Sequence, residues 1–324
     1  MSQFASTLVA WQKRHGRHGL PWQGTRDPYR IWLAEVMLQQ TQVAAVIPYY
    51  ERFLQRFPDV LSLAAASEDE VLRLWSGLGY YARGRNLHAA ARKLALSGFP
   101  RAQEKIKEIP GVGRSTAAAI AVFAFGKRAA ILDGNVKRVL ARQFDISKED
   151  DLWAKAERLL PRKNIERYTQ ALMDLGATLC VRKNPRCGEC PVRAGCVARK
   201  QGRVDELPAP RARKATPLRR ATWYVYRNNG QVLLERRPAH GLWGGLWTFP
   251  EAPLYRAGKP RALPAFEHGF THFRLRIKPF LYEIKNKESR TAVPGRLWID
   301  LETARAAAVP TPVRTLLASL PAAR

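Results

Sequence analysis

The chain has 324 residues, with 55 Lys and Arg against 27 Asp and Glu, so its formal net charge is +28. This length is enough for two domains with sizeable cores. The excess of positive charge favours a polyanionic partner: nucleic acid first, with a membrane surface as the alternative. No run of about 18 apolar residues is present, and the first residues lack the pattern of a signal peptide. We therefore expect an intracellular protein without a membrane span.

Residues 3 to 200 carry the apolar spacing of helices. Apolar side chains recur at intervals of three and four residues in IWLAEVMLQQTQVAAVI (31–47), EDEVLRLWSGL (68–78), GRNLHAAARKLAL (84–96) and RSTAAAIAVFAFG (114–126). This pattern predicts an all-α domain.

One carboxylate lies inside an apolar helical stretch. Asp27 as N-cap and Pro28 as first residue predict the start of a helix that includes Glu35. The neighbours of Glu35 at three and four residues are Ile31, Trp32, Leu38 and Gln39. The carboxylate therefore shares a face with apolar side chains. A partly exposed glutamate on an amphipathic helix is the ordinary interpretation.

Two short segments follow, and the first of them suits contact with nucleic acid. Residues 105–126 contain Gly111 and Gly113 between two helical patterns, a helix-hairpin-helix signature in which the main chain turns tightly and helix amides can hold a phosphate. An ordinary tight helical turn is the alternative. Shortly after, Asp133 precedes a Gly and an Asn where a helix would begin, which by itself is the pattern of an N-cap.

All four cysteines of the chain lie within one loop, residues 180–196. They are Cys180, Cys187, Cys190 and Cys196. In a reducing compartment such a cluster predicts metal ligation rather than disulfides. The spacing suits a [4Fe–4S] cluster or tetrahedral zinc.

The composition changes after the helical part. Residues 202–220 are rich in Pro, Arg and Lys and predict an exposed linker. Beyond them, Asn229 and Gly230 separate two β-rich halves, a hairpin pattern. FRLRIKPFLYEI (273–284) alternates with period two, and a final helix is expected over 312–320. We therefore expect a smaller α+β domain over 221–324.

Longer segments of the chain also match a known pattern. They are LPWQGTRDPYRIWLAEVMLQQTQV (20–43), GLGYYARGRNLH (77–88), IPGVGRSTAAAI (109–120), ILDGNVKRVLAR (131–142), the cysteine loop, GLWGGLWTFPE (241–251) and FEHGFTHFRLRI (266–277). Together they resemble adenine DNA glycosylases of the MutY type, in the helix-hairpin-helix superfamily that also holds endonuclease III. The resemblance implies a multidomain protein: an all-α helix-hairpin-helix glycosylase domain with an iron–sulfur loop (1–201), a basic linker (202–220) and an α+β Nudix-like lesion-recognition domain (221–324).

The resemblance implies a monofunctional enzyme that removes adenine mispaired with 8-oxoguanine or guanine and leaves an abasic site. The adenine must be flipped out of the duplex before its glycosidic bond can be reached. Glu35 would be the general acid at N7, because an apolar environment raises a carboxyl pKa. Asp133 would face the sugar cation, supported by Asn135. Ser115 occupies the position where endonuclease III carries a Schiff-base lysine.

Further site residues carry over by position. Trp22, Gln23 and Gln170 would line the adenine pocket. Gln40 and Tyr80 would wedge into the base stack, Arg182, Lys183 and Arg186 would meet phosphates, and Phe270, Thr271 and His272 would read the oxidised guanine. The ordinary interpretations are a capped helix end for Gln40 and a core tyrosine for Tyr80.

The resemblance also implies one [4Fe–4S] cluster on the four cysteines, a double-stranded DNA partner with A:8-oxoguanine or A:G mispairs, a monomer, and a place in the cytoplasm or nucleoid of a bacterium. The C-terminal part lacks the run of glutamates that binds Mg²⁺ in a Nudix box, so we expect no hydrolysis there. Two alternatives remain: an endonuclease III-like glycosylase and lyase for oxidised pyrimidines, and a non-catalytic iron–sulfur DNA-binding protein.

Overall fold

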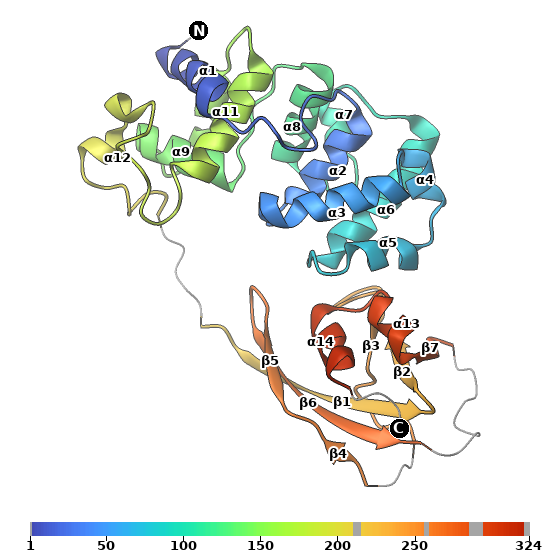
Figure 1. Cartoon of the computed structure of the whole chain (residues 1–324). Coiled ribbons are helices and arrows are strands. Elements are labelled where there is room, and N and C mark those ends of the chain that lie inside the picture. The colour runs from blue at the N-terminus through green and yellow to red at the C-terminus, as the bar shows by residue number, and fades with distance from the viewer. Residues whose placement is uncertain (1, 210–214, 256–258, 285–293, 321–324) are drawn as a thin grey trace. The chain divides into compact units, whose positions relative to one another are not determined.

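The computed structural model describes residues 2–209, 215–255, 259–284 and 294–320. The chain divides into two compact units: unit 1 is Met1–Ala65 with Ala89–Ala212, and unit 2 is Ala66–His88 with Arg213–Arg324. Figure 1 shows helices through unit 1 and a sheet in unit 2. Unit 2 thus includes residues 66–88, which the sequence groups with the helical domain.

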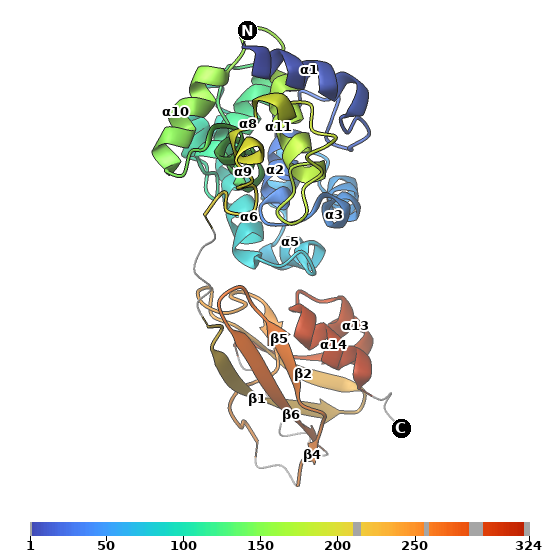
Figure 2. The same cartoon turned by 90° about the vertical axis from the view of Figure 1, so that its left-hand side faces the viewer.

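Unit 1 is built from helices, as the apolar spacing predicts. They are α1 Gln3–His15, α2 Pro28–Leu38, α3 Val43–Arg56, α4 Val60–Ala65, α7 Gln103–Lys107, α8 Arg114–Phe125, α9 Gly134–Phe144, α10 Glu149–Leu159, α11 Ile165–Thr178, the short 3₁₀ turn η1 Arg193–Gly195 and α12 Val197–Lys200. Helix α6, Tyr81–Ser97, runs from unit 2 into unit 1. Helix α1 packs along α11, and the two helices lie side by side in both views (Figures 1 and 2).

Helix α2 carries Glu35 and begins where the sequence predicts. The Asp27 carboxylate accepts a hydrogen bond from the main-chain N–H of Tyr29 at 2.9 Å, and Pro28 opens the helix. The helix ends at Leu38, and Gln40 follows with φ of +58°. Most of α2 is buried, because it packs against the alanine-rich helix α8. Small side chains on α8 allow this close approach.

Helices α9 and α11 meet closely at a glycine. A Cβ atom added to Gly176 would lie 2.7 Å from the Cβ of Asn135 and 3.1 Å from its main-chain carbonyl. The Gly176 carbonyl also accepts a hydrogen bond from the Arg138 guanidinium at 2.7 Å. A side chain at position 176 would therefore force the two helices apart.

Unit 2 contains a mixed sheet. Its strands are β1 Leu218–Asn228, β2 Gln231–Arg236, β3 Trp247–Thr248, β4 Arg261–Ala262, β5 Phe266–Gly269, β6 Arg274–Glu283 and β7 Arg296–Asp300. The described strands pair in the order β3-β2-β1-β6-β4, with β5 on β6 and β7 on β2. Strands β1 and β6 run parallel, with Leu218 opposite Arg274 and Arg227 opposite Glu283. Helices α13 Leu301–Ala306 and α14 Thr311–Ser319 lie on one face of the sheet (Figure 2).

The predicted hairpin and final helix are confirmed. Asn229 and Gly230 join β1 to β2 with φ of +45° and +78°, values that suit this pair in a two-residue turn. Helix α14 begins and ends one residue earlier than predicted.

The segment predicted to be an exposed linker, residues 202–220, is partly buried in the structure. Leu207 is buried, and its carbonyl accepts a hydrogen bond from the Arg142 side chain at 2.8 Å, so the first part packs on unit 1. Residues 210–214 lie outside the described residues, and the last part already belongs to β1.

Unit 2 also contains the helix α5, Glu68–Trp75.

Candidate active site

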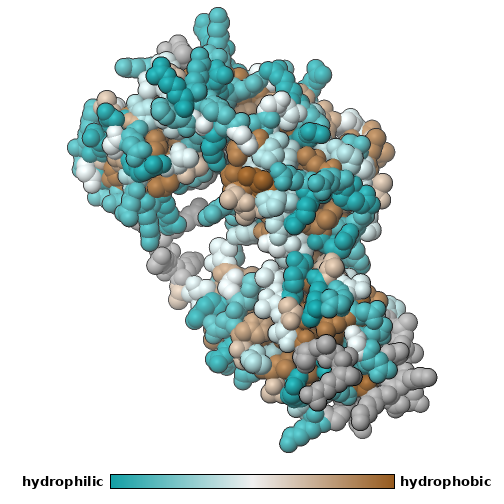
Figure 3. All heavy atoms as spheres, viewed as in Figure 1, coloured by the Kyte–Doolittle hydropathy of each residue, from teal (hydrophilic) through white to brown (hydrophobic). Residues whose placement is uncertain are grey.

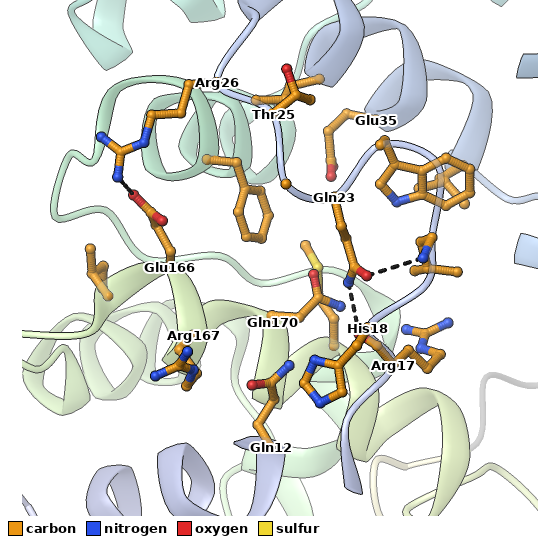
Figure 4. A pocket seen from close by; sticks show the side chains of 18 of the residues that line it. Gln12, Arg17, His18, Gln23, Thr25, Arg26, Glu35, Glu166, Arg167 and Gln170 are labelled. Atoms are coloured by element: carbon orange, nitrogen blue, oxygen red, sulfur yellow. Dashed lines mark hydrogen bonds and ion pairs between the residues drawn. The ribbon is translucent and has the colours of Figure 1, made fainter. Parts of the chain in front are cut away.

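A cavity of about 680 Å³ opens in unit 1. Among the side chains that line it are those of Gln23, Glu35 and Gln170 (Figure 4). Trp22 lines it as well, so four residues that the sequence predicts in one site meet here. They come from the loop before α2, from α2 itself and from α11. The structure thus brings together residues that are up to about half of the chain apart in sequence.

The Glu35 carboxyl is a weaker acid in this cavity than a glutamate in water. Burial, and then the negative charge of Asp133, raise the pKa of the Glu35 carboxyl to about 8. Ile31 and Leu38 of the same helix line the cavity with it. A carboxyl group with this pKa is protonated at neutral pH and can give up its proton, as a general acid must.

Asp133 forms the N-cap of α9, which confirms the ordinary interpretation of this residue. Its Oδ1 accepts hydrogen bonds from the main-chain N–H groups of Asn135 and Val136, both at 2.8 Å. The helix N-terminus favours a negative charge at this point. The cap also fixes the carboxylate in place, so one residue can both begin the helix and present an anion near Glu35.

Asn135 supports Asp133 through its main chain. Its side-chain oxygen instead accepts a hydrogen bond from the Arg138 guanidinium at 2.8 Å. Arg138 also donates to the carbonyl of Cys180 at 2.7 Å. The start of α9 is therefore tied through Arg138 to the first cysteine of the loop.

Ser115 is partly buried at the start of α8. Its hydroxyl oxygen accepts a hydrogen bond from the main-chain N–H of Leu132 at 3.0 Å. Leu132 directly precedes Asp133 in the sequence. Ser115 thus holds the segment that directly precedes Asp133, and neither residue is among those that line the cavity.

Trp22 and Gln23 are held in the loop between α1 and α2. The ring of Trp22 meets that of Tyr50 edge-on, with ring centroids 5.4 Å apart. The Gln23 side chain donates to the carbonyl of Arg17 at 2.9 Å and accepts from the N–H of Leu20 at 3.1 Å. Both side chains are therefore held in place by their neighbours in the protein.

Several cavity residues had no signal in the sequence analysis. Arg26 and Glu166 form an ion pair at 2.8 Å beside the cavity. Gln12 and His18 also line it (Figure 4). These residues come from three separate segments, and no spacing rule connects them. A buried carboxylate, Asp174, lies behind Gln170 and was likewise missed.

The helix-hairpin-helix segment has the expected form. Helix α7 is followed by a turn in which Gly111 has φ of +80°, and Gly113 is the N-cap of α8. A Cβ added to Gly113 would meet open space, so a partner can approach the main chain there. The Gly111 carbonyl accepts a hydrogen bond from the Gln39 side chain at 3.1 Å, which joins this turn to the end of α2.

Gln40 and Tyr80 both have left-handed main-chain conformations, with φ of +58° and +49°. Such conformations are strained for residues with a side chain and are frequent at functional sites. Both side chains are exposed, with Tyr80 at 46%. The core interpretation of Tyr80 is therefore wrong.

The predicted lesion loop lies between β5 and β6 in unit 2. The rings of Phe270 and Phe273 stack with centroids 4.4 Å apart, and His272 is exposed. The hydroxyl groups of Tyr80 and Thr271 are 2.9 Å apart within unit 2 and form a hydrogen bond. Two candidate residues 191 positions apart are thus brought together.

The four cysteines line one small cavity of about 30 Å³. The same cavity is lined by the arginines Arg142, Arg186, Arg193 and Arg199. Burial first, and the neighbouring cysteines next, raise the pKa of the Cys190 thiol to about 11. In the described part of the chain, no group of three or more His, Cys, Asp or Glu residues is arranged to hold a metal ion. The shared cavity and the surrounding positive charge nevertheless suit an anionic thiolate cluster.

The exposed basic residues of the cysteine loop, 180–196, are Arg182, Lys183, Arg186 and Arg193. Arg186 is partly engaged, because its guanidinium donates to the Thr178 carbonyl at 3.0 Å and pairs with Glu189 at 3.3 Å. Hydrophilic side chains project from much of the visible face of unit 1 (Figure 3).

No helix among the described residues is long and apolar enough to cross a membrane.

Two sequence families match the chain. Residues 33–162 match the HhH-GPD superfamily of base excision DNA repair proteins, and residues 221–319 match the NUDIX domain. The first match contains Glu35, Ser115 and Asp133.

Solved structures of DNA glycosylases share the helical fold. A thermostable thymine-DNA glycosylase is similar with a TM-score of 0.57 and 30% identity, over 61% of this chain and 95% of that one. Endonuclease III in a non-covalent complex with DNA has a TM-score of 0.54 and 22% identity, over 62% of this chain and 96% of that one, and shows the fold alone.

Curated relatives match along almost the whole chain. The adenine DNA glycosylase of Buchnera aphidicola subsp. Baizongia pistaciae is 34% identical over 98% of this chain and 96% of its own length. The rat enzyme is 34% identical over 97% of this chain and 77% of its own length, and the human enzyme 33% identical over 97% and 73%. The order of the two domains is the one that the resemblance implies. The chain is therefore a member of the adenine DNA glycosylase family, a DNA N-glycosylase of base excision repair.

Proposed function

We propose that the enzyme removes adenine from A:8-oxoguanine and A:G mispairs in double-stranded DNA, and that Glu35 and Asp133 carry the reaction. The observation that carries this proposal is the Glu35 carboxyl in the unit 1 cavity, with its pKa raised to about 8 by burial and by Asp133. Adenine flipped out of the duplex would enter this cavity beside Trp22, Gln23 and Gln170.

In the proposed mechanism, Glu35 donates its proton to N7 of adenine. The electrons of the bond between N9 and C1′ then pass to the base, which leaves as neutral adenine. The carboxylate of Asp133, held by two main-chain N–H groups, stabilises the positive charge that develops on the sugar. Water adds to C1′, and its proton restores Glu35. The product is an abasic site.

Ser115 gives this chain no amine for a Schiff base, and its hydroxyl is engaged with Leu132. This supports simple hydrolysis over the lyase step of the endonuclease III alternative. The non-catalytic alternative gives no reason for an acid of raised pKa inside a cavity.

DNA contact is assigned to the helix-hairpin-helix turn at Gly111 and Gly113, to the exposed wedge residues Gln40 and Tyr80, and to the cysteine loop. We further propose that Cys180, Cys187, Cys190 and Cys196 hold one [4Fe–4S] cluster. The cluster would shape the loop that presents Arg182 and Lys183 to phosphates. Arg186 can join them by exchanging its Glu189 partner for a phosphate.

The test is single-turnover base release from duplexes that carry adenine opposite 8-oxoguanine, guanine and thymine. We expect fast release opposite 8-oxoguanine, slower release opposite guanine and very slow release opposite thymine. Equal rates on all three duplexes would contradict the proposed mispair preference.

A further inference from the structure

Asp174 is a buried carboxylate beside the cavity that the proposed mechanism does not use. Its side chain is only 1% exposed, and it lies four residues after Gln170 on α11. A buried charge is costly unless hydrogen bonds and an opposite charge compensate it. A group of this kind therefore calls for an explanation.

Three donors point at the two oxygens of Asp174. The Nε of Arg17 donates to Oδ1 at 2.7 Å and the main-chain N–H of Arg17 donates to Oδ2 at 3.1 Å. The side-chain Nε2 of Gln170 donates to Oδ1 at 2.9 Å. All three bonds require Asp174 to act as an acceptor, which an ionised carboxylate does.

We propose that Asp174 is a positioning residue that makes the cavity selective for a purine with an amino group at C6, and that it acts through Gln170. The proposal rests on the assignment of Gln170 to the adenine pocket. Because the carboxylate only accepts, the Gln170 amide must turn its nitrogen toward Asp174. Its carbonyl oxygen then points into the cavity, toward the side where Glu35 lies (Figure 4).

Arg17 orients the second glutamine of the cavity as well. Its carbonyl accepts from Gln23 Nε2 at 2.9 Å, while its N–H and guanidinium hold Asp174. The amide of Gln23 is fixed further by the bond from Leu20 to its Oε1. Asp174 thus sets the direction of the Gln170 amide and the main chain of Arg17 and Leu20 that of the Gln23 amide, and neither amide can rotate without breaking a hydrogen bond.

The fixed carbonyl of Gln170 distinguishes purines by their group at C6. Adenine carries an amino group there and can donate to an acceptor. Hypoxanthine carries a carbonyl, so two acceptors would face each other. Sites that must hydrogen-bond a donor reject analogues that lack it far more strongly than apolar sites can.

The test is the ratio of single-turnover release of adenine to that of hypoxanthine, each opposite 8-oxoguanine, in the full-length protein. In Asp174→Asn, an amide nitrogen replaces one acceptor. If that nitrogen takes the place of Oδ1, it meets the Arg17 Nε–H as a second donor, and it can bond to Gln170 only when the Gln170 amide turns over and presents its NH₂ group to the base. If it faces the N–H of Arg17, two donors collide and the lock is lost. We expect the ratio to fall at least about tenfold. A purely structural role would slow both substrates by the same factor and leave the ratio unchanged.

Asp145→Asn is the matched control. Asp145 also forms an ion pair with an arginine, Arg203, at 2.9 Å, but it is far more exposed and ends α9. Its left-handed conformation, with φ of +52°, is one that Asn adopts readily. This variant should keep the parental ratio.

Gln170→Met keeps the proposal testable if Asp174→Asn does not fold. It removes the fixed acceptor and leaves the ion pair of Asp174 with Arg17, and it should lower the ratio as well. Adding Asp174→Asn to Gln170→Met should then change the ratio no further. A parental ratio in Gln170→Met, or a parent enzyme that releases hypoxanthine as fast as adenine, would overturn the inference. The proposed mispair preference is tested by a different measurement, in which the base opposite adenine is varied, so the failure of one proposal can be distinguished from the failure of the other.

Discussion

The hydroxyl oxygen of Ser115 accepts a hydrogen bond from the main-chain N–H of Leu132 at 3.0 Å, and Leu132 directly precedes Asp133. The first turn of α8 is therefore joined to the segment that begins α9. The Ser115 hydroxyl therefore supports the main chain next to Asp133.

Ser115→Ala should lower stability and slow base release together. The N–H of buried Leu132 would lose its partner, which costs about 1 to 3 kcal/mol of unfolding free energy. Thermal unfolding and single-turnover kinetics measure the two effects. Ser97→Ala removes an exposed serine hydroxyl that bonds to the Lys93 carbonyl, and it should change neither. A Ser115→Ala protein with parental stability would show that the bond contributes nothing.

Glu35→Gln keeps the size of the side chain but removes its transferable proton. We expect the chemical step to slow by about 10²- to 10⁴-fold, while binding to mismatched duplex persists. Glu104→Gln, on the exposed first turn of α7, is the control and should keep the parental rate. Near-parental base release by folded Glu35→Gln would remove Glu35 from the mechanism.

The pH dependence of the parent enzyme follows from the same carboxyl. A general acid is active when protonated, and the pKa of Glu35 is raised to about 8. The single-turnover rate should therefore be nearly level on the acid side of pH 8 and should fall about tenfold per pH unit above it. In Glu35→Gln this fall should disappear from the residual rate. A parental rate that rises through pH 8 would give Glu35 the opposite role, that of a base.

Asp133→Asn separates the charge of Asp133 from its capping role. Asn is an equally good N-cap, so α9 should form normally. The negative charge proposed to face the sugar is lost, and we expect a loss of rate of at least about 10²-fold, with DNA binding retained. Asp27→Asn makes the same change at the N-cap of α2 and should remain active. Comparable rates for the two variants would mean that the charge of Asp133 is not needed.

The metal content tests the role of the four cysteines. Purified protein should contain iron and inorganic sulfide in about equal amounts, about four of each per chain, and should be coloured. Cys187→Ser should lower both contents and weaken DNA binding. Stoichiometric zinc without sulfide would contradict the cluster.

The bond between Tyr80 and Thr271 predicts that the two hydroxyls act as a pair. Thr271→Val and Tyr80→Phe should each reduce the preference for 8-oxoguanine over guanine opposite adenine, by about threefold to tenfold. The double variant should lose no more than either single variant. Thr315→Val, which removes an exposed hydroxyl from α14, is the control. Additive losses would show that the hydroxyls act separately.

Local patterns account for much of this fold. The start of α2 at Asp27 and Pro28, and the turn at Asn229 and Gly230, were predicted because each depends on a few adjacent residues. The packing of Leu207 on unit 1 was not predicted, because a Pro- and Arg-rich composition says nothing about one buried leucine. The membership of residues 66–88 in unit 2 depends on tertiary contacts, such as the ion pair of Asp69 with Arg236 at 2.8 Å.

The candidate site was predicted in part. The apolar neighbours of Glu35 indicated a raised pKa, and the structure gives it the predicted direction and cause. The roles of Gln23 and Gln170 came from the resemblance alone. Asp174 was missed because its partner, Arg17, lies 157 residues away in the sequence. Hydrogen bonds across such separations leave no periodic pattern.

The glycine at position 176 has a wider consequence for how this enzyme can vary. Helix α11 carries Gln170, and the N-terminus of α9 is capped by Asp133, so the absent side chain at Gly176 determines how far apart these two candidate site residues are held. A shift of about 1 Å between reacting groups can cost 10²-fold in rate. A substitution that only widens the distance between α9 and α11 can therefore alter catalytic efficiency, although every reactive group of the enzyme stays the same.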